Sequence, residues 1–380
     1  MKKFRIVAAL LSTMMLLAAC GNLDSTSSSS TTPTTSKKKV QTTGQTNSNN
    51  YQGVIKNGHY LTSAARGVTN DQDNNTMNLK SFESGLLNVS KKEFKPSKYI
   101  FQEGQYLSTS TVQKWVERKS NDNPTGLNPV DNGQKDANKR NPLYLQTIEE
   151  QDYMTQDGDN LSLSGMTIGI GLNSVDYYTK EKYGAQYSTN ISDEQMTTQG
   201  RAIAAEVLKR VRATKGVGKD VPIVIALYKQ ASDDSLVGGT FFSYSVNDGN
   251  NISSWQNINQ RNVVFPSAGG SSTSGTSNDE SNFENFKTQI QNFFPNLSGV
   301  TAQAQYQDDN LAGMNVTITT QFYSQTEIIS FTQYLAQVAP KYLPSGVPID
   351  ITVQSTDGVQ SFLSRDSGQT KFSTHVFGSY

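Results

Sequence analysis

Cys20 carries the most specific chemistry in this sequence. It is the only cysteine among the 380 residues, so no disulfide can form within the chain. Leu17-Ala18-Ala19 precedes it, and this order is typical of a lipobox, in which the cysteine thiol receives a diacylglyceryl group and a signal peptidase cuts between Ala19 and Cys20. The alternative is an ordinary export signal with an incidental cysteine. We expect lipidation at Cys20, because the small residues stand where that processing requires them.

The segment before Cys20 has the layout of a bacterial secretory signal. Lys2, Lys3 and Arg5 form a basic head, and residues 6–19 form an apolar run. The run is too short to cross a bilayer as a helix, which takes about 20 residues. Two or more acyl chains hold a protein firmly, at about 0.8 kcal/mol per buried CH₂. The sequence therefore predicts a membrane-tethered surface protein that the lipoprotein-processing enzymes mature.

Motifs for catalysis and metal binding fail on their spacing. The two histidines, His59 and His375, lie far apart and have no neighbouring ligands at metal-site spacing. A run beginning at Asp71 resembles a calcium loop, but Thr76 and Phe82 stand where glycine and an acid are needed. We therefore expect no catalytic residues, no metal and no cofactor, and we interpret the protein as a non-enzyme. A cell-envelope enzyme with an unrecognised active site is the alternative.

Aromatic residues between positions 99 and 115 form a second candidate site. Rings supply large contact area at small entropy cost, so this set could line a groove for a peptide or a glycan. The favoured alternative is hydrophobic core, with a helix over residues 109–118. The candidate groove residues are Tyr99, Phe101, Tyr106 and Trp115.

The charge balance argues against one class of partner. The chain carries 33 basic and 33 acidic side chains. Loss of Lys2, Lys3 and Arg5 with the signal leaves 30 basic side chains against the 33 acidic ones, a net charge of −3. Proteins that bind nucleic acid usually show a basic surface, so we expect no nucleic-acid partner.

Composition divides the chain into five parts. After the signal peptide (1–19), residues 20–50 are rich in Ser and Thr and poor in apolar side chains, which predicts a disordered tether with a reach of roughly 30 Å. A globular domain should follow over 51–265. The Gly/Ser-rich stretch 266–281 indicates a linker, and 282–380 should form a C-terminal domain.

Two regions share one order of elements. Each has an apolar strand, a helix that follows a capping box, and a Val/Ile-rich strand. In the first region the strand covers 165–173, the helix 193–213 and the next strands 221–228 and 236–245. In the second region the strand covers 313–322, a helix follows Ser324, and Pro340 should limit it before a strand at 347–354.

This pattern predicts an α+β fold of two domains with mixed sheets, and with β-α-β-β units that are either duplicated or alike by chance. The two capping boxes are expected at Ser192 with Gln195 and at Ser324 with Glu327.

Several stretches resemble a known family. The segments NGHYLTSAARGVT, SFESGLLNVSKKEF, YIFQEGQYL, LSGMTIGIGLNSVDYY and IALYKQASDDSLVGGTFF resemble the serial motifs of the CamS-type sex-pheromone lipoprotein precursors of Gram-positive bacteria. They occur in the family order between Tyr51 and Phe242. The resemblance implies a lipoprotein, acylated for example with palmitate, that stays on the outer face of the cytoplasmic membrane through diacylglyceryl-Cys20.

The resemblance also implies that the signal peptide has a product. In such precursors an intramembrane cut releases an apolar peptide of seven or eight residues, which is secreted and induces conjugation through a peptide receptor in recipient cells. A spent signal peptide without a receptor is the alternative. The peptide implied here begins at Ser12 or Thr13 and comprises Ser12, Thr13, Met14, Met15, Leu16, Leu17, Ala18 and Ala19. For the mature domains we expect a binding or interaction module.

Overall fold

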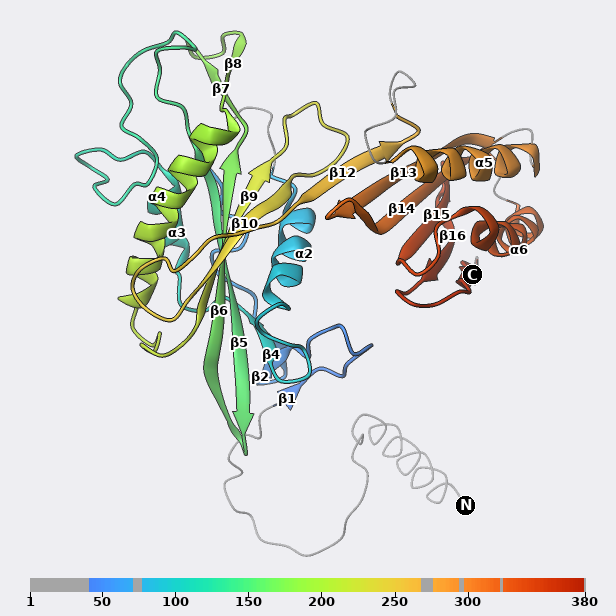
Figure 1. The fold of residues 1–380 in the computed structure, drawn as a ribbon, viewed down its shortest axis with the longest axis horizontal. Helices are drawn as coiled ribbons and strands as arrows, with labels where there is room; N and C mark the ends of the chain where they lie inside the picture. The colour runs from blue at the N-terminus through green and yellow to red at the C-terminus, as the bar shows by residue number, and fades with distance from the viewer. Residues whose placement is uncertain (1–40, 71–76, 268–275, 294–296, 322–323, 379–380) are drawn as a thin grey trace, which may run out of the picture. The chain divides into compact units, whose positions relative to one another are not determined.

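The computed structural model describes residues 41–70, 77–267, 276–293, 297–321 and 324–378 (Figure 1). The signal peptide, Cys20 and most of the expected tether lie outside the described residues. Within the described parts, no helix is both long and apolar enough to cross a membrane. Residues 40–380 form one compact unit.

The first large sheet is mixed and has the strand order β11-β10-β9-β6-β5-β4. Its strands are β4 (Ile100–Glu103), β5 (Leu145–Asp157), β6 (Asn160–Asn173), β9 (Ile223–Gln230), β10 (Thr240–Asn247) and β11 (Gln256–Asn257). The central pair, β6 and β9, is parallel, and its neighbours on both sides are antiparallel. The parallel pair is joined through a helix, as parallel strands require.

Helices cover both faces of this sheet (Figure 1). On one face lie α3 (Thr109–Val116) and α4 (Asp193–Arg212), and on the other lies α2 (Leu79–Ser90). Strand β9 serves both cores, because successive side chains of a strand point to opposite faces. Ile223, Ile225 and Leu227 pack toward α3 and α4, whereas Val224, Ala226 and Tyr228 pack toward α2.

The second large sheet has the order β12-β13-β14-β15-β16-β17. Its strands are β12 (Gln260–Phe265), β13 (Leu297–Gln307), β14 (Asn310–Thr320), β15 (Ile349–Ser355), β16 (Gly358–Arg365) and β17 (Ser373–Val376). Helices α5 (Ser277–Phe293) and α6 (Gln325–Tyr342) pack on one face and enclose the core with it. On the opposite face most side chains are polar, with Val264 and Phe362 as apolar members, and these side chains are exposed or half-buried.

The two sheets repeat one topology, which confirms the duplication. Apart from a separate two-stranded sheet inserted before the second helix of the first unit, each unit runs strand, helix, strand, strand, helix, strand, strand, strand, with one parallel pair across the second helix. In the first unit the parallel pair is β6 with β9, and in the second it is β14 with β15. The expected α+β class with mixed sheets is therefore confirmed.

Two small sheets complete the fold. One contains β1 (Gln41–Thr42), β2 (Val54–Lys56) and β3 (His59–Tyr60), and the other contains β7 (Val175–Thr179) and β8 (Gln186–Asn190). Strand β1 pairs with β2, so ordered chain begins within the range expected to be tether.

Helix ends agree with the sequence in one unit and differ in the other. At α4 the Ser192 side chain accepts from the Gln195 N–H and the Gln195 side chain accepts from the Ser192 N–H, which confirms that capping box. The box expected at Ser324 is wrong, because its side chain makes no capping hydrogen bond. Pro340 does not end α6, which continues to Tyr342.

The boundary between the units also lies earlier than composition indicates. Strand β12 falls in the range 51–265 that we assigned to the first domain, yet it pairs with β13 of the second sheet. Helix α5 begins at Ser277, inside the range 266–281 expected to be linker. Glycine and serine content does not report which sheet a neighbouring strand joins.

Candidate ligand-binding cleft

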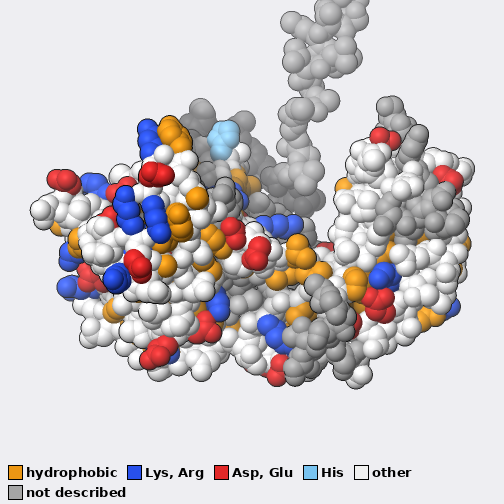
Figure 2. Space-filling model, turned by 90° about the horizontal axis from the view of Figure 1, so that it is seen from above, with side chains coloured by type: hydrophobic (Ala, Val, Ile, Leu, Met, Phe, Trp, Pro, Cys, Tyr) orange, Lys and Arg blue, Asp and Glu red, His pale blue; other side chains and the backbone are white. Residues whose placement is uncertain are grey.

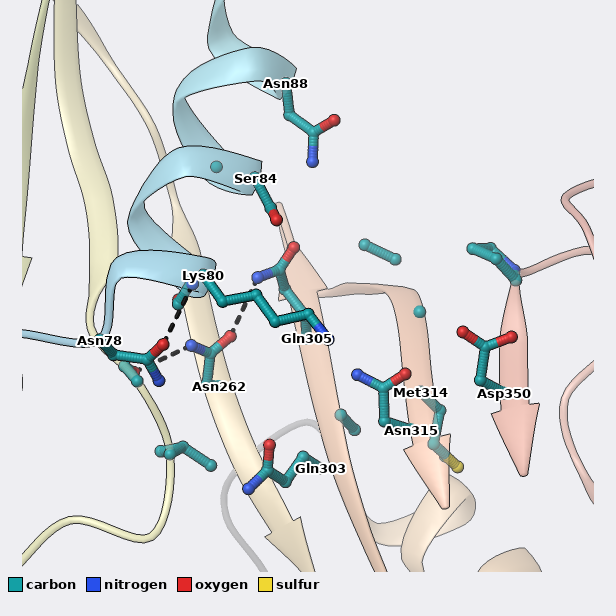
Figure 3. Close-up of a pocket in the computed structure, with 18 residues that line it drawn as sticks. Asn78, Lys80, Ser84, Asn88, Asn262, Gln303, Gln305, Met314, Asn315 and Asp350 are labelled. Atoms are coloured by element: carbon teal, nitrogen blue, oxygen red, sulfur yellow. Dashed lines mark hydrogen bonds between the residues drawn. The ribbon is translucent and has the colours of Figure 1, made fainter. Parts of the chain in front are cut away.

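A polar cleft of about 470 Å³ lies where α2 faces the polar side of the second sheet (Figure 3). Ligand sites in proteins commonly measure about 300–1,000 Å³. We call it the amide cleft because side-chain amides dominate its lining. The amides are Asn78, Asn88, Asn262, Gln303, Gln305 and Asn315.

Helix α2 forms one wall of the amide cleft through a single stripe of its surface. Residues spaced three or four apart share a helix face, so Ser81, Ser84 and Asn88 face the cleft together. The opposite stripe is apolar and fully or almost fully buried, with Phe82 and Leu86 in the first unit's core. Packing of that apolar stripe fixes which polar residues the helix presents.

The floor of the cleft is a row of polar residues on three neighbouring strands. Gln303 of β13 is opposite Asn315 of β14, and Asn315 is opposite Asp350 of β15. Neighbouring strands lie about 4.8 Å apart, so the row spaces its polar groups at that interval. All three side chains are exposed. The row runs across the sheet, and along each strand the residues just before and just after its member belong to the core on the other side.

Hydrogen bonds fix one side of the cleft. The Asn262 Nδ2 donates to the carbonyl oxygens of Gly238 and Gly239 at 3.0 and 3.2 Å. The Gln305 Nε2 donates to Asn262 Oδ1 at 3.1 Å, and the Gln303 Nε2 donates to the Leu236 carbonyl at 2.8 Å. Gln303 and Gln305 bond through their nitrogens, so their amide oxygens keep their acceptor capacity, whereas the Asn262 oxygen already accepts one hydrogen bond.

On the other side of the cleft, side chains keep their hydrogen-bonding capacity. Within the described residues, Ser84, Asn315 and Asp350 make no side-chain hydrogen bond. In Figure 3 the Lys80 side chain extends from α2 across the opening. Burial raises the pKa of Asp350 and nearby Asp366 raises it further, whereas Lys80 opposes the shift. The cleft thus offers one cation, one anion and many neutral donors and acceptors.

A smaller acidic pocket of about 180 Å³ lies on the other edge of α2. Glu83 and Leu87 of the helix line it, together with Glu103 and Glu149. Arg66 lies at its rim, 2.8 Å from Glu83 and 3.5 Å from Glu103. Burial, and then Glu83, raises the pKa of Glu149 to about 8. This carboxyl is therefore largely protonated at neutral pH.

Beside the acidic pocket, a buried carboxyl pair holds a loop in place. Glu150 accepts from the backbone N–H groups of Gln105, Tyr106 and Leu107 at 3.1, 3.0 and 2.7 Å. Asp152 accepts from the same Gln105 N–H at 3.1 Å, and burial with its neighbour Glu150 raises its pKa to about 9. Glu150 also lines the acidic pocket, but its carboxylate accepts three backbone N–H groups, so the pair positions the loop before α3.

The aromatic residues expected to line a groove are divided between two cores. Tyr99 and Phe101 pack at the cluster around Tyr153 under α2, and Phe101 also lines the acidic pocket. Tyr106 and Trp115 pack with the other cluster, under α3 and α4. The structure does not bring the four rings to one surface. Trp115 is buried, as the core interpretation of this segment expects.

The remaining sequence candidates are placed apart or lie outside the described residues. His59 is in β3 and His375 is in β17. Across the described ranges, no group of three or more His, Cys, Asp or Glu side chains is arranged to hold a metal ion. Cys20 and the peptide residues Ser12 to Ala19 lie outside the described part of the chain.

Sequence reasoning missed the amide cleft. A signal was present in TAQAQYQ, residues 301–307, where polar residues alternate with small or aromatic ones. Such alternation predicts a strand with one polar face. The three strands of the cleft floor lie up to 47 positions apart in sequence, from Gln303 to Asp350. Their adjacency follows only from the topology.

The fold defines a tandem α+β protein made of two related mixed-sheet units. A family model described as CamS sex pheromone cAM373 precursor matches residues 60–371. The chain therefore belongs to the CamS family of sex pheromone precursors. That family assignment confirms the resemblance in the sequence motifs.

Solved structures agree with the assignment. A sex pheromone precursor from Lactobacillus salivarius subsp. salivarius is 54% identical, with a TM-score of 0.84, and the match covers 90% of this chain and all of that one. The C-terminal domain of the sex pheromone staph-cAM373 precursor from Staphylococcus aureus is 30% identical, with a TM-score of 0.69, and the match covers 81% and 99% of the two chains. No curated protein matches the sequence.

Proposed function

We propose that this chain is the precursor of a lipid-anchored surface protein, and that its signal peptide yields a short apolar peptide signal. Membership of the CamS family and the Leu17-Ala18-Ala19-Cys20 sequence support the proposal. The mature part would sit on the outer face of the cytoplasmic membrane through diacylglyceryl-Cys20. Its partners at this stage are the lipoprotein-processing enzymes and the membrane.

Lipidation is tested by changing Cys20→Ala and labelling cells with a radioactive fatty acid. The wild-type protein should carry label and the variant should carry none, because no other residue supplies the thioether. The variant should also keep the length of the uncut precursor on a gel. Label retained on the variant contradicts the lipoprotein assignment.

The signalling role of the released peptide needs a separate test. Synthetic TMMLLAA, residues 13–19, should induce plasmid transfer in a responsive recipient, whereas a scrambled peptide of the same composition should not. A receptor distinguishes the order of side chains, while membrane partitioning depends only on total hydrophobicity. Equal activity of the two peptides would show that no receptor recognises the order of the side chains.

For the mature part, the geometry best supports a binding module that uses the amide cleft. The observation that carries this function is a concave site with six side-chain amides in its lining, in which Ser84, Asn315 and Asp350 make no side-chain hydrogen bond within the described residues. A concave site in which several polar groups converge beside small and apolar residues suits a ligand that needs its orientation fixed by hydrogen bonds. We expect the ligand to be a component of the cell envelope that surrounds the anchored protein.

Cosedimentation with isolated cell envelopes tests the binding function. The unlipidated mature chain, residues 20–380 with Cys20→Ser, should bind saturably. Asn315→Trp should abolish binding because the indole fills the centre of the cleft floor, whereas Gln354→Trp, on the same sheet face outside the cleft, should not. Equal binding of the two tryptophan variants would exclude the cleft as the site.

A second function is favoured by the acidic pocket. Glu149, protonated near neutral pH and close to Glu83 and Glu103, could serve as a general acid in a cell-envelope hydrolase. Glu149→Gln should then abolish turnover of an envelope substrate while envelope binding through the amide cleft persists. Unchanged turnover in this variant would exclude the pocket as an active site.

A further inference from the structure

We propose that the amide cleft binds a neutral glycan, a chain of sugars that presents hydroxyl or acetamido groups. This inference rests on the proposed binding function and names the class of its ligand. It follows from the charge of the site, from the kinds of hydrogen-bonding groups it presents and from its position on the face of a sheet.

The charge of the cleft favours a ligand without net charge. Its lining includes one basic side chain, Lys80, and one acidic side chain, Asp350, and the two interact electrostatically. Asp350 would repel a strongly anionic ligand, and Lys80 would repel a strongly cationic one. Figure 2 shows charges of both signs interspersed over the visible coloured surface, without a single-sign patch that would steer a charged polymer.

The hydrogen-bonding groups of the cleft suit a ligand whose groups both donate and accept. A side-chain amide carries two N–H donors and a carbonyl acceptor, and a hydroxyl does both with one oxygen. Asn315 and Ser84 present such groups without a partner in the described chain, and Gln303 presents its acceptor oxygen. Sugar hydroxyls and acetamido groups also both donate and accept, so one such group can donate one hydrogen bond to the cleft and accept another from it.

The position of the cleft argues against a peptide strand as the ligand. A peptide usually adds to a sheet at an edge, where backbone N–H and C=O groups are unpaired. The floor strand β14 is paired along both sides, with β13 and with β15. Only side chains face the cleft from this strand, so a peptide would find no backbone ladder there.

Small and apolar residues at one end of the cleft leave a surface for the C–H face of a sugar ring. Ala312 and Gly313 lie beside the exposed ring of Pro348. A Cβ placed on Gly313 would lie 3.5 Å from the Pro348 ring, so the glycine leaves the space beside that ring open. A flat apolar strip next to amide groups matches a sugar, which has an apolar face and a polar rim.

Titration calorimetry with defined probes tests the proposal on the unlipidated mature chain. The probes are an N-acetylglucosamine tetramer, a glucose tetramer and tetra-alanine amide with an acetylated N-terminus. At least one of the sugars should bind, and the affinity should change less than twofold between low and high salt, because neutral ligands are not screened. Tetra-alanine should not bind.

Variants locate the binding. Asn315→Ala and Gln303→Ala should each weaken the sugar about tenfold, the effect of losing one well-made hydrogen bond. Gln354→Ala, on the same sheet face outside the cleft, should change the affinity less than twofold. Melting temperatures of the variants should stay near wild type, because both cleft side chains are exposed.

Each other outcome overturns the glycan assignment. Binding of tetra-alanine alone would replace the glycan with a peptide. Binding of none of the probes, while Asn315→Trp still abolishes cosedimentation with envelopes, would leave the binding function intact and refute the ligand class. Equal weakening by Gln354→Ala and Asn315→Ala would place the sugar elsewhere on the sheet.

Discussion

Met166 and Met314 occupy the same place in the two units, at the start of the parallel pairing, yet the strand segments that follow them meet different surroundings. In each unit the methionine N–H donates to the carbonyl of a proline at 3.1 Å, Pro222 in the first and Pro348 in the second. The next residue of the chain is buried Thr167 in the first unit and exposed Asn315 in the second. One topology thus serves as an internal layer in one unit and as an open surface in the other.

The difference continues along both strands of the parallel pair. On β6 the residues after Thr167 on the same face are Gly169 and Gly171, and the matching residues of β14 are Thr317 and Thr319. On the partner strands, the apolar set of the first unit is replaced by polar residues in the second. The matched pairs are Val224 with Asp350, Ala226 with Thr352 and Tyr228 with Gln354.

Helix α2 explains these differences between the two sheets. It packs on the first sheet so closely that a Cβ on Gly169 would lie 2.7 Å from the Phe82 ring and 2.8 Å from Leu86. No side chain larger than hydrogen fits there without movement of the helix. The corresponding face of the second sheet carries full-size polar side chains, and the space above part of it is the amide cleft. Composition of one strand face therefore decides whether the face becomes core or binding surface.

The largest effect is expected when a β-branched side chain is placed on the crowded face. Gly169→Val should lower the free energy of unfolding by about 3 kcal/mol, because overpacking a rigid core costs about 1–3 kcal/mol and two fully buried side chains must move. Thr317→Val, at the matching position, should change it by less than about 0.5 kcal/mol. Urea denaturation measures both. Equal losses would show that the two faces do not differ in packing.

A second comparison concerns carboxyl groups beside α2 and on the open face. The pKa of Glu149 is raised to about 8 by burial, whereas an unperturbed glutamate has a value of 4.5. The folded state keeps the proton that the unfolded state loses, so the free energy of unfolding should fall as pH rises from about 4.5 to 8.

Glu149→Gln should remove this loss and stabilise the protein at pH 8 by roughly 2 kcal/mol, while leaving stability at pH 4 almost unchanged. Asp350→Asn in the open cleft should flatten the pH profile much less, because that group is far more exposed. Unfolding experiments across pH 4–8 compare the two. A steeper pH profile in the glutamine variant would contradict the assignment of the raised pKa to Glu149.

The smallest expected effects compare the two capped helices. Ser192→Ala should cost about 1 kcal/mol because its side chain accepts from the Gln195 N–H at 3.2 Å. Ser324→Ala should cost only a few tenths of a kcal/mol, since the Ser324 side chain makes no capping hydrogen bond. Thermal melts resolve the pair. A larger loss at Ser324 would mean that the cap forms in solution.

The sequence predicts the elements that rest on local pattern. The apolar runs of β6 and β9, the α4 helix with its cap and the repeated order of the two units all follow from periodicity and capping residues. The cleft does not follow from such patterns. Gln303, Asn315 and Asp350 are ordinary exposed strand residues when each is considered alone, and only pairing across three strands makes them a site.

The errors also have physical causes. Pro340 lies in the last turn of α6, so the helix can continue for two more residues after it. Strand β12 precedes the Gly/Ser-rich stretch whose composition indicates the domain boundary, whereas its hydrogen bonds are to β13. The aromatic set from Tyr99 to Trp115 is divided because the chain crosses from one face of the sheet to the other between Phe101 and Tyr106.

The strand order of both sheets has a consequence for how the chain assembles. Within each large sheet the spatial order of the strands follows their order in the chain, from β4 to β11, with β7 and β8 paired separately, and then from β12 to β17. A chain that emerges N-terminus first can therefore add every new strand to an edge that already exists. The first sheet is complete at Asn257, before Gln260 begins the second. Pairing with a strand that is distant in sequence slows folding and leaves unpaired edges exposed to aggregation. The strand order of this chain keeps such pairings few.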